Sequence, residues 1–242
     1  MDDYDHEKVH IQFNQRIPMR DGITLSANIF YPSDAGESKK YPVILTRTPY
    51  MKLNEGMLVP AKYFVEHRYI FVAMDVRGRG DSDGEFIPYI NEGQDGYDAI
   101  EWCASQAWSD GNVGTIGSSY PGRIQWLAAL HQPPHLRAMV VRVTPSDPFV
   151  ETPTGLPSPM HLCWLHFVSG RTNQLMEAVD WSQIYEHLPM LTMDERIGRS
   201  IPHWHSDIEH PQLDDYWEPL CYQNKFERIN VPVLHISGWY DD

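Results

Sequence analysis

Six short apolar runs, spaced between polar and helix-like stretches, constrain the fold of this chain more than any other feature. They occupy residues 23–31, 42–46, 69–74, 112–116, 138–141 and 232–236. The first run alternates apolar and polar residues, as a half-buried antiparallel strand does. The other five are continuous and suit strands that are covered on both faces of a parallel sheet. Helical patterns lie between them at 61–67, 93–105 and 122–131, so we expect an α/β fold with an open, mostly parallel central sheet.

The stretch from residue 148 to residue 228 interrupts this alternation. It is rich in Pro, Trp, Met and His, and its helical patterns, for example at 174–179, come without an apolar strand run. We interpret it as a helical cap insertion between two strands, rather than as a separate domain with its own function. The predicted domains are the N-terminal part of the sheet core at 1–147, the cap at 148–228, and a return to the core at 229–242.

A serine flanked by glycines lies where the third continuous run meets the helical pattern that follows it. The segment reads Gly117-Ser118-Ser119-Tyr120-Pro121-Gly122. In a nucleophile elbow, a sharp turn from strand to helix lifts a serine hydroxyl above the sheet, and small neighbours relieve the crowding. Ser119 fits better than Ser118, because Gly117 lies two residues before Ser119 whereas Ile116 takes that place for Ser118. A Gly/Ser turn that only caps the helix is the alternative interpretation.

This segment resembles the G-x-S-Y-x-G elbow of the X-Pro dipeptidyl-peptidase and cocaine-esterase-like hydrolases. That family also includes α-amino acid ester hydrolases and glutaryl cephalosporin acylases. Further segments resemble the family and occur in the same order along the chain. Residues 17–25 are similar to its opening hairpin, and residues 47–52 to the loop after its third strand. Residues 75–84 and 95–102 follow in their usual places, and residues 238–241 are similar to the segment that bears the catalytic acid. The resemblance covers residues 16–150 and 231–241 and implies an α/β-hydrolase fold, with the cap inserted and the last strand and acid loop at 229–242.

The resemblance also implies catalytic roles residue by residue. Ser119 is expected to attack the substrate carbonyl, while the backbone N–H of Tyr120 and the phenol of Tyr50 form the oxyanion hole. Asp241 is expected to orient the catalytic histidine and to stabilise its imidazolium form, with Asp242 as the local alternative. Without the resemblance, Tyr50 is better explained as an aromatic packed in its loop, and spacing alone identifies neither acid.

No histidine follows Asp241, although the order in this fold is serine, then acid, then histidine. All 12 histidines precede Asp241, and those nearest the motifs, His131, His135 and His235, are best explained as core or surface residues. We therefore expect the catalytic histidine to lie outside this chain, the fold to be truncated at its C-terminus, and the fragment alone to be inactive.

The function that these residues predict is a serine hydrolase that cleaves an ester or amide acyl bond through an acyl-enzyme intermediate. An X-Pro dipeptidyl-peptidase is the alternative within the family, and it needs an acidic site for the free amine of its substrate. The alternative from another class is a catalytically inactive hydrolase-fold scaffold that binds a ligand or partner. The acyl transfer needs no cofactor and no metal.

The composition of the chain disfavours some classes of binding partner and cellular location. The formal net charge of −14 disfavours nucleic acid, which binds clustered Lys and Arg, and no run of about 18 apolar residues is present to span a membrane. We expect a small-molecule ester or amide substrate, and a homo-oligomer is compatible with the sequence. The start of the chain is acidic and polar, and the 3 cysteines are too few for a disulfide framework, so we expect reduced thiols and a cytoplasmic location.

One histidine cluster has the appearance of a metal site. His203 and His205 alternate around Trp204, with Asp207 and His210 close behind in the sequence. Alternate residues share a face only on a strand, and no strand pattern occurs there. We therefore predict no metal site, and expect the tryptophans of the cap to fill its own core.

Overall fold

The computed structural model describes residues 9–36, 38–147 and 156–240. The chain forms two compact units, one made of residues 1–144 and 224–242 and the other of residues 145–223. The predicted core and cap meet at 147/148 and 228/229, a few residues from these unit boundaries. Each unit is described by itself below.

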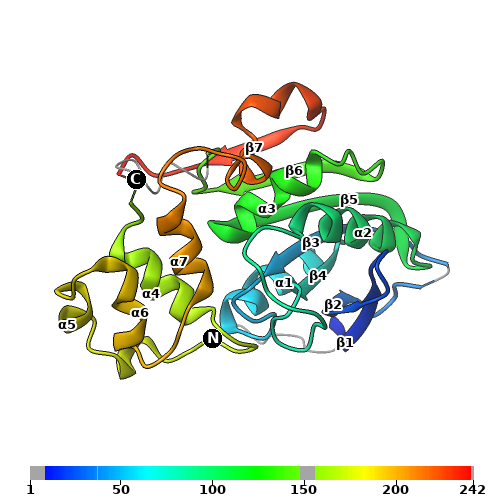
Figure 1. Cartoon of the computed structure of the whole chain (residues 1–242). Coiled ribbons are helices and arrows are strands. Elements are labelled where there is room, and N and C mark those ends of the chain that lie inside the picture. The colour runs from blue at the N-terminus through cyan, green and yellow to red at the C-terminus, as the bar shows by residue number, and fades with distance from the viewer. Residues whose placement is uncertain (1–8, 37, 148–155, 241–242) are drawn as a thin grey trace. The chain divides into compact units, whose positions relative to one another are not determined.

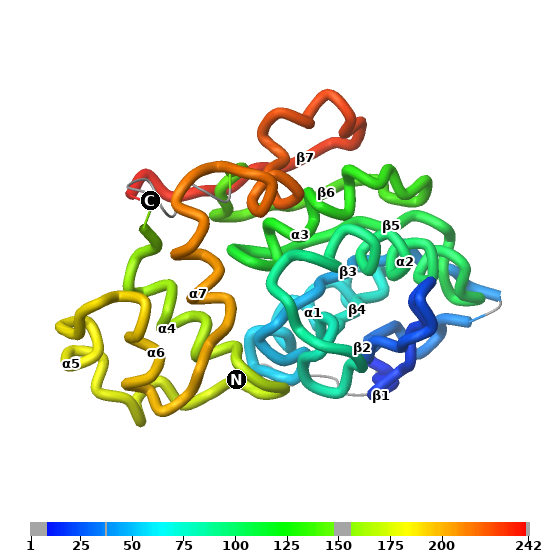
Figure 2. The backbone as a smooth tube through the Cα atoms, viewed as in Figure 1, coloured from blue at the N-terminus to red at the C-terminus, as the bar shows by residue number. Residues whose placement is uncertain are grey.

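The first unit is built on a seven-stranded sheet in the order β1-β2-β4-β3-β5-β6-β7 (Figures 1 and 2). Its strands are β1 (Val9–Pro18), β2 (Thr24–Pro32), β3 (Tyr41–Thr48), β4 (Ile70–Asp75), β5 (Ser109–Ser118), β6 (Leu136–Arg142) and β7 (Val233–Ile236). The pairs β1–β2 and β2–β4 are antiparallel, and the strands from β4 through β3, β5 and β6 to β7 are parallel. The expected α/β-hydrolase architecture, a mostly parallel sheet entered through antiparallel strands, is confirmed.

Each of the six apolar runs forms a strand of this sheet. The continuous run at 69–74 gives β4, in which every residue is buried, because the strand lies inside the sheet between β2 and β3. β1 is different: most of its residues are exposed, and its sequence lacks the apolar run that predicts the other strands. Only the resemblance to an opening hairpin indicated it.

Three helices cover the sheet: α1 (Glu55–Glu66), α2 (Glu92–Ser105) and α3 (Tyr120–Ala129). Ala61 and Val65 of α1 pack on Phe71 and Ala73 of β4. The helices α2 and α3 lie close together, since a Cβ on Gly96 of α2 would come within 2.5 Å of the Ala128 side chain. The same Cβ would meet the Arg47 guanidinium at 2.5 Å, so the charged side chain of β3 extends into the contact between α2 and α3.

The second unit is helical, as expected of the cap. Its helices are α4 (Pro159–Phe167), α5 (Trp181–Tyr185), α6 (Met193–Arg196) and α7 (Pro202–Glu209), with short 3-10 turns between them. Leu162, Ile184, Met193 and Trp204 lie in its core, and the indole of Trp204 donates to the Met190 carbonyl at 2.9 Å. The helical pattern at 174–179 yields only a 3-10 turn, η3 (Met176–Ala178).

Candidate active site

Ser119 is the single residue between the end of β5 and the start of α3. Its backbone has φ 57° and ψ −125°, a conformation that is unfavourable for a residue with a side chain and is typical of functional sites. The surroundings hold it there: the Ser119 N–H donates to the Arg142 carbonyl at 3.0 Å, and the Ser119 carbonyl accepts from the N–H groups of Gly122 and Arg123 at 2.8 and 2.9 Å. Ser119 is exposed, whereas Ser118 belongs to β5 and is paired with β6.

Two glycines allow this turn to be so sharp. A Cβ on Gly117 would lie 2.4 Å from the Pro121 carbonyl oxygen, and a Cβ on Gly122 would lie 2.9 Å from the Arg142 carbonyl oxygen. Both contacts are with backbone, which cannot give way cheaply. Gly122 therefore lies where α3 passes β6, and this explains why the second glycine comes one residue later than in G-x-S-x-G.

Tyr120, the first residue of α3, is held by a buried polar network. Its phenol donates to Glu92 Oε1 at 2.9 Å and accepts from the Tyr89 N–H at 3.0 Å. Glu92 Oε2 in turn accepts from Arg47 Nη1 at 2.7 Å, and both side chains of this ion pair are about 95% buried. Arg47 also donates through Nη2 to the Glu92 carbonyl at 2.8 Å. The network joins β3, α2 and α3 directly beneath the elbow.

Burial governs the protonation of this network. Loss of hydration raises the pKa of Glu92, and the nearby Asp95 adds to this, while the Arg47 charge opposes it. Burial likewise raises the pKa of the Tyr120 phenol well above its ordinary value, with the Glu92 charge acting in the same direction. Tyr120 is therefore a neutral hydrogen-bonding group here, and its side chain serves to fix the first turn of α3.

The loop that carries Tyr50 is held by a second set of buried charges. Lys52 donates to Asp75 through its backbone N–H at 2.6 Å and through Nζ at 2.7 Å, and Arg79 Nε donates to the Pro49 carbonyl at 2.8 Å. Lys52, Asp75 and Arg79 are almost completely buried. The backbone is thus anchored on both sides of Tyr50, whose own N–H donates to Thr48 Oγ1 at 3.0 Å.

Arg79 links this loop to the elbow. Burial lowers the pKa of its guanidinium to about 10, against the opposing effects of Asp75, Tyr120 and Tyr50. The Arg79 Cζ lies 5.7 Å from the centre of the Phe86 ring, and that ring lies 5.9 Å from the Tyr120 ring, centre to centre. Arg79 therefore contacts the backbone next to Tyr50 and a ring that packs near Tyr120.

The predicted acids, Asp241 and Asp242, lie outside the described residues. The strand that precedes them, β7, runs parallel to β6 and β5, and the Val143 N–H donates to the Ile236 carbonyl at 2.9 Å. The carboxyl ends of parallel strands meet at one edge of a sheet, and Ser119 follows β5 at that edge. The chain that leads to Asp241 thus leaves the sheet on the side of the nucleophile.

Within the described part of the chain, no histidine forms a hydrogen bond with Ser119. The three histidines nearest the motifs have other neighbours: His235 stacks on Trp126, and His135 Nδ1 lies 2.7 Å from Glu101. His131 lies against α2, since a Cβ on Gly93 would come within 2.6 Å of its Nε2. None of the three is placed to deprotonate the serine.

The histidines that are clustered in the cap sequence pair with different carboxylates in the structure. His205 pairs with Asp194 at 2.8 Å and His210 with Asp214 at 2.7 Å, whereas the side chain of Trp204 lies in the core. The described residues contain no group of three or more His, Cys, Asp or Glu side chains that could hold a metal ion.

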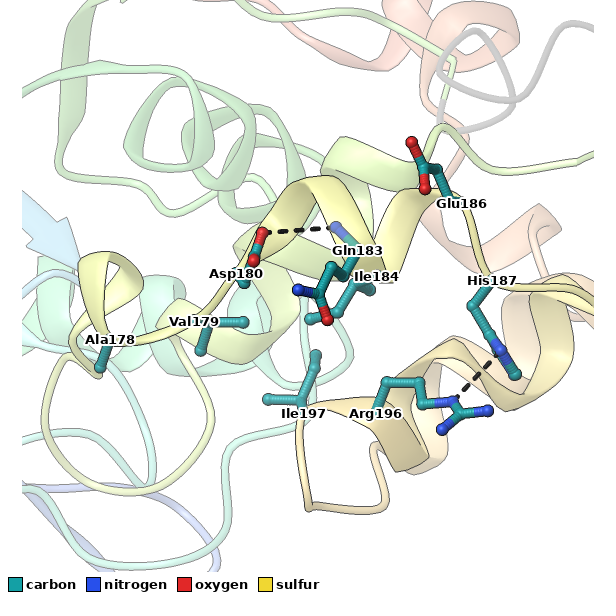
Figure 3. A pocket seen from close by; sticks show the side chains of 9 residues that line it. All are labelled: Ala178, Val179, Asp180, Gln183, Ile184, Glu186, His187, Arg196 and Ile197. Atoms are coloured by element: carbon teal, nitrogen blue, oxygen red, sulfur yellow. Dashed lines mark hydrogen bonds between the residues drawn. The ribbon is translucent and has the colours of Figure 1, made fainter.

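A cavity of about 550 Å³ lies within the second unit (Figure 3). At one side Arg196 Nε donates to His187 Nδ1 at 3.2 Å, and at the other the Gln183 N–H donates to Asp180 Oδ1. Its lining carries charges of both signs and contains none of the predicted catalytic residues. We therefore assign the chemistry to the elbow and not to this cavity.

Sequence reasoning missed the charged residues that hold the site, namely Arg47, Lys52, Asp75, Arg79 and Glu92. One signal was present: Arg47 and Asp75 come at the carboxyl ends of apolar runs, which in a parallel sheet is the edge that carries the elbow. Glu92, Lys52 and Arg79 gave no such signal.

Comparison with known proteins identifies relatives of this chain. The chain is 30% identical to cocaine esterase of Rhodococcus sp. (strain MB1 Bresler) over 94% of its own length and 43% of that protein. A CocE/NonD family hydrolase from Staphylococcus aureus superposes with a TM-score of 0.69 at 26% identity, covering 93% of this chain and 40% of that one. An α-amino acid ester hydrolase has a TM-score of 0.81 at 24% identity, covering 100% of this chain and 45% of that one.

The chain thus spans less than half the length of these three relatives. The matched family model is that of the X-Pro dipeptidyl-peptidases (S15 family), and it extends over residues 21–242. Because that match includes the elbow, the Tyr50 loop and the buried charges around them, this chain belongs to the X-Pro dipeptidyl-peptidase (S15) family.

Proposed function

We propose that the protein is a serine hydrolase that cleaves an ester or amide bond through an acyl-enzyme intermediate on Ser119. The observation that carries the proposal is the backbone of Ser119, which is exposed at the end of a strand and held in a strained conformation by three hydrogen bonds. Strain of this kind persists where the surroundings over-determine it, as they do at catalytic turns. Membership of a family that includes a cocaine esterase supports the same reaction.

The proposed reaction has two stages, acylation of Ser119 and hydrolysis of the acyl-enzyme. Ser119 Oγ attacks the carbonyl carbon while its proton passes to a base, and the resulting oxyanion accepts hydrogen bonds from the Tyr120 N–H and the Tyr50 phenol. The base then protonates the leaving alcohol or amine as its bond to the carbonyl carbon breaks. Water then attacks the carbonyl carbon of the acyl-enzyme while the base takes its proton. The base returns that proton to Ser119 Oγ as the bond between this oxygen and the carbonyl carbon breaks, and the carboxylic acid is released. The N-terminal end of α3 beneath Ser119 favours negative charge at this position.

The base in this proposal is a histidine outside the 242 residues, oriented by Asp241. Support comes from the described histidines, none of which bonds to Ser119. We expect residues 1–242 alone to show almost no turnover, because loss of one triad member costs several orders of magnitude in kcat. Rapid ester hydrolysis by a purified chain 1–242 of verified mass would contradict this and would point to one of the 12 histidines present.

Labelling with a fluorophosphonate probe tests the nucleophile. The full-length protein that carries this chain should be labelled and should hydrolyse 4-nitrophenyl butyrate, and Ser119→Ala should abolish both. Ser118→Ala is the matched control, since it removes a neighbouring hydroxyl of the same strand end. If labelling survives Ser119→Ala and is lost in Ser118→Ala, the assignment is wrong.

Labelling and hydrolysis assays on the full-length protein also distinguish the proposed function from two alternatives. An X-Pro dipeptidyl-peptidase is favoured by the name of the matched family and would cleave Gly-Pro-4-nitroanilide faster than simple esters. A catalytically inactive scaffold would bind ligand but would neither label nor turn over, even at full length. We propose the esterase or acylase because a relative that is 30% identical to this chain is a cocaine esterase.

The substrate and location remain part of the proposal. We propose a small-molecule ester or amide as the substrate. None of the helices in the part of the chain that the structure describes has the length and apolar character that crossing a bilayer requires. Cys103, Cys163 and Cys221 are all free, which supports our proposal of a reducing, cytoplasmic environment.

A further inference from the structure

Arg123 is a buried cation that forms no ion pair with a described residue. It lies in the first turn and a half of α3, is only 3% exposed, and its Cζ lies 4.3 Å from the centre of the Tyr89 ring. Among the described residues, neither its Nε nor its Nη2 has a hydrogen-bond partner, although both atoms are enclosed. A stacked ring compensates a buried guanidinium only in part, so a charge kept in this state needs another explanation.

The unpaired nitrogens form the edge of the guanidinium that matches a carboxylate. Nε and Nη2 lie side by side and donate in parallel, as a fork. Two other arginines of this unit use that edge in this way: Arg77 donates through Nε and Nη2 to the two oxygens of Asp95 at 2.9 and 2.6 Å, and Arg20 donates through the same pair to Asp98. In Arg123 the same two nitrogens have no hydrogen-bond partner among the described residues.

The position of Arg123 connects that edge to the nucleophile. Arg123 comes four residues after Ser119, on the same side of α3, and its N–H donates to the Ser119 carbonyl at 2.9 Å. Helical side chains lean toward the N-terminus of their helix, and Tyr89, on which the guanidinium stacks, itself stacks on Tyr120 with ring centres 4.3 Å apart. The guanidinium therefore lies beside the first turn of α3, next to the elbow.

We propose that Arg123 binds a carboxylate of the substrate through Nε and Nη2, and that the protein therefore prefers esters or amides that carry a carboxylate. This proposal rests on the proposed hydrolase function and specifies its substrate class. Tyr89 holds the guanidinium in place, because its ring stacks on Tyr120 and its N–H donates to the Tyr120 phenol. A purely structural side chain at this buried position would gain from being apolar.

Matched substrate pairs test the preference in the full-length protein. One pair carries the charge on the acyl side: 4-nitrophenyl hydrogen adipate and its methyl ester. The other carries it on the leaving group: 4-butyryloxybenzoate and its methyl ester. In at least one pair we expect kcat/KM of the carboxylate to exceed that of the neutral ester by about 10- to 100-fold, chiefly through a lower KM.

Variants then assign the preference to Arg123. Arg123→Met should bring the ratio of the two kcat/KM values to about one, and Arg123→Lys should keep part of it, since the charge stays but the fork is lost. Arg137→Gln is the control: it removes the same charge from an exposed residue and should leave the ratio unchanged. We also expect Arg123→Met to raise the melting temperature, because it removes an uncompensated buried charge.

Two results overturn the proposal: a wild-type ratio near one in both pairs, or a ratio that survives Arg123→Met. If the wild type hydrolyses no neutral ester and labels with no fluorophosphonate, the proposed function fails separately. The carboxylate site is then decided by calorimetric titration with 4-nitrobenzoate. Binding that is lost in Arg123→Met supports the site, and no binding to the wild type rejects it.

Discussion

The two segments assigned to the oxyanion hole are held in different ways. Tyr120 is part of a regular helix, so its backbone N–H is positioned by the hydrogen bonds of α3 and by the turn at Ser119. Tyr50 lies in an irregular loop, where two buried cations bind the chain on either side: Lys52 through Asp75, and Arg79 through the Pro49 carbonyl. The Tyr120 N–H is thus positioned by hydrogen bonds between residues close in sequence, whereas the position of Tyr50 depends on buried charges from distant segments.

The largest expected effect follows from removing the anion that holds the loop. Asp75→Asn leaves the buried Lys52 ammonium with only the exposed carboxylate of Asp81, 2.9 Å away, which should destabilise the protein by about 3–5 kcal/mol. Urea unfolding measures the loss, and kcat should fall with it because the Tyr50 loop is released. Asp34→Asn, which breaks an exposed pair with Lys39, is the control and should change stability by less than about 1 kcal/mol. Equal effects of the two variants would mean that burial does not matter at Asp75.

The next largest effect concerns the loop donor itself. Tyr50→Phe should lower kcat by about 10²- to 10³-fold with KM nearly unchanged, because its hydrogen bond strengthens only toward the tetrahedral intermediate. Steady-state kinetics with 4-nitrophenyl butyrate measure this, with the exposed Tyr63→Phe as the control. A Tyr50→Phe variant with wild-type kcat would show that the phenol only packs in its loop.

A smaller effect is expected when the phenol of Tyr120 is removed. Tyr120→Phe breaks the bond to Glu92 and should cost about 1–3 kcal/mol of stability, since a buried acceptor loses its partner. Its kcat should fall less than tenfold, because the N–H that we propose as an oxyanion donor is fixed by the helix. The comparison between the segments fails if Tyr120→Phe lowers kcat more than Tyr50→Phe does.

The smallest effect is a pH dependence at Glu92. A carboxyl whose pKa is higher in the folded than in the unfolded protein stabilises the fold most at low pH, and that contribution is lost as the pH rises through the folded pKa. The stability gap between the wild type and Glu92→Gln should therefore narrow as the pH rises above about 4.5. Unfolding curves from pH 4.5 to 8 measure the gap, with the exposed Glu66→Gln as control. A gap that widens with pH would show that Arg47 outweighs the burial of Glu92.

Much of the fold could be predicted from local pattern. The run at 69–74 predicted β4, and the glycines around Ser119 predicted the turn between β5 and α3. These features depend on residues a few positions apart, and periodicity and glycine spacing report on them directly. The mostly exposed β1 and the 3-10 turn η3 escaped this reasoning, because neither has a strong apolar period.

The candidate site could be predicted only in part. Its nucleophile segment was visible, and the oxyanion residues were named through a family resemblance. Asp241 stays a prediction, since it lies outside the described residues. The buried charges were not predicted, because a charged residue in a sequence usually belongs to the surface and nothing local marks it as buried.

The sequence by itself determined the order of strands and helices, the position of the elbow and the family of the chain. Only the tertiary structure decided that Arg47 pairs with Glu92, 45 residues away, that Lys52 pairs with Asp75, and that Nε and Nη2 of Arg123 have no hydrogen-bond partner among the described residues. The physical reason is the range of the forces involved. Backbone conformation follows neighbouring residues, whereas the state of a charge depends on which distant segments exclude water from it and which of them supply an opposite charge.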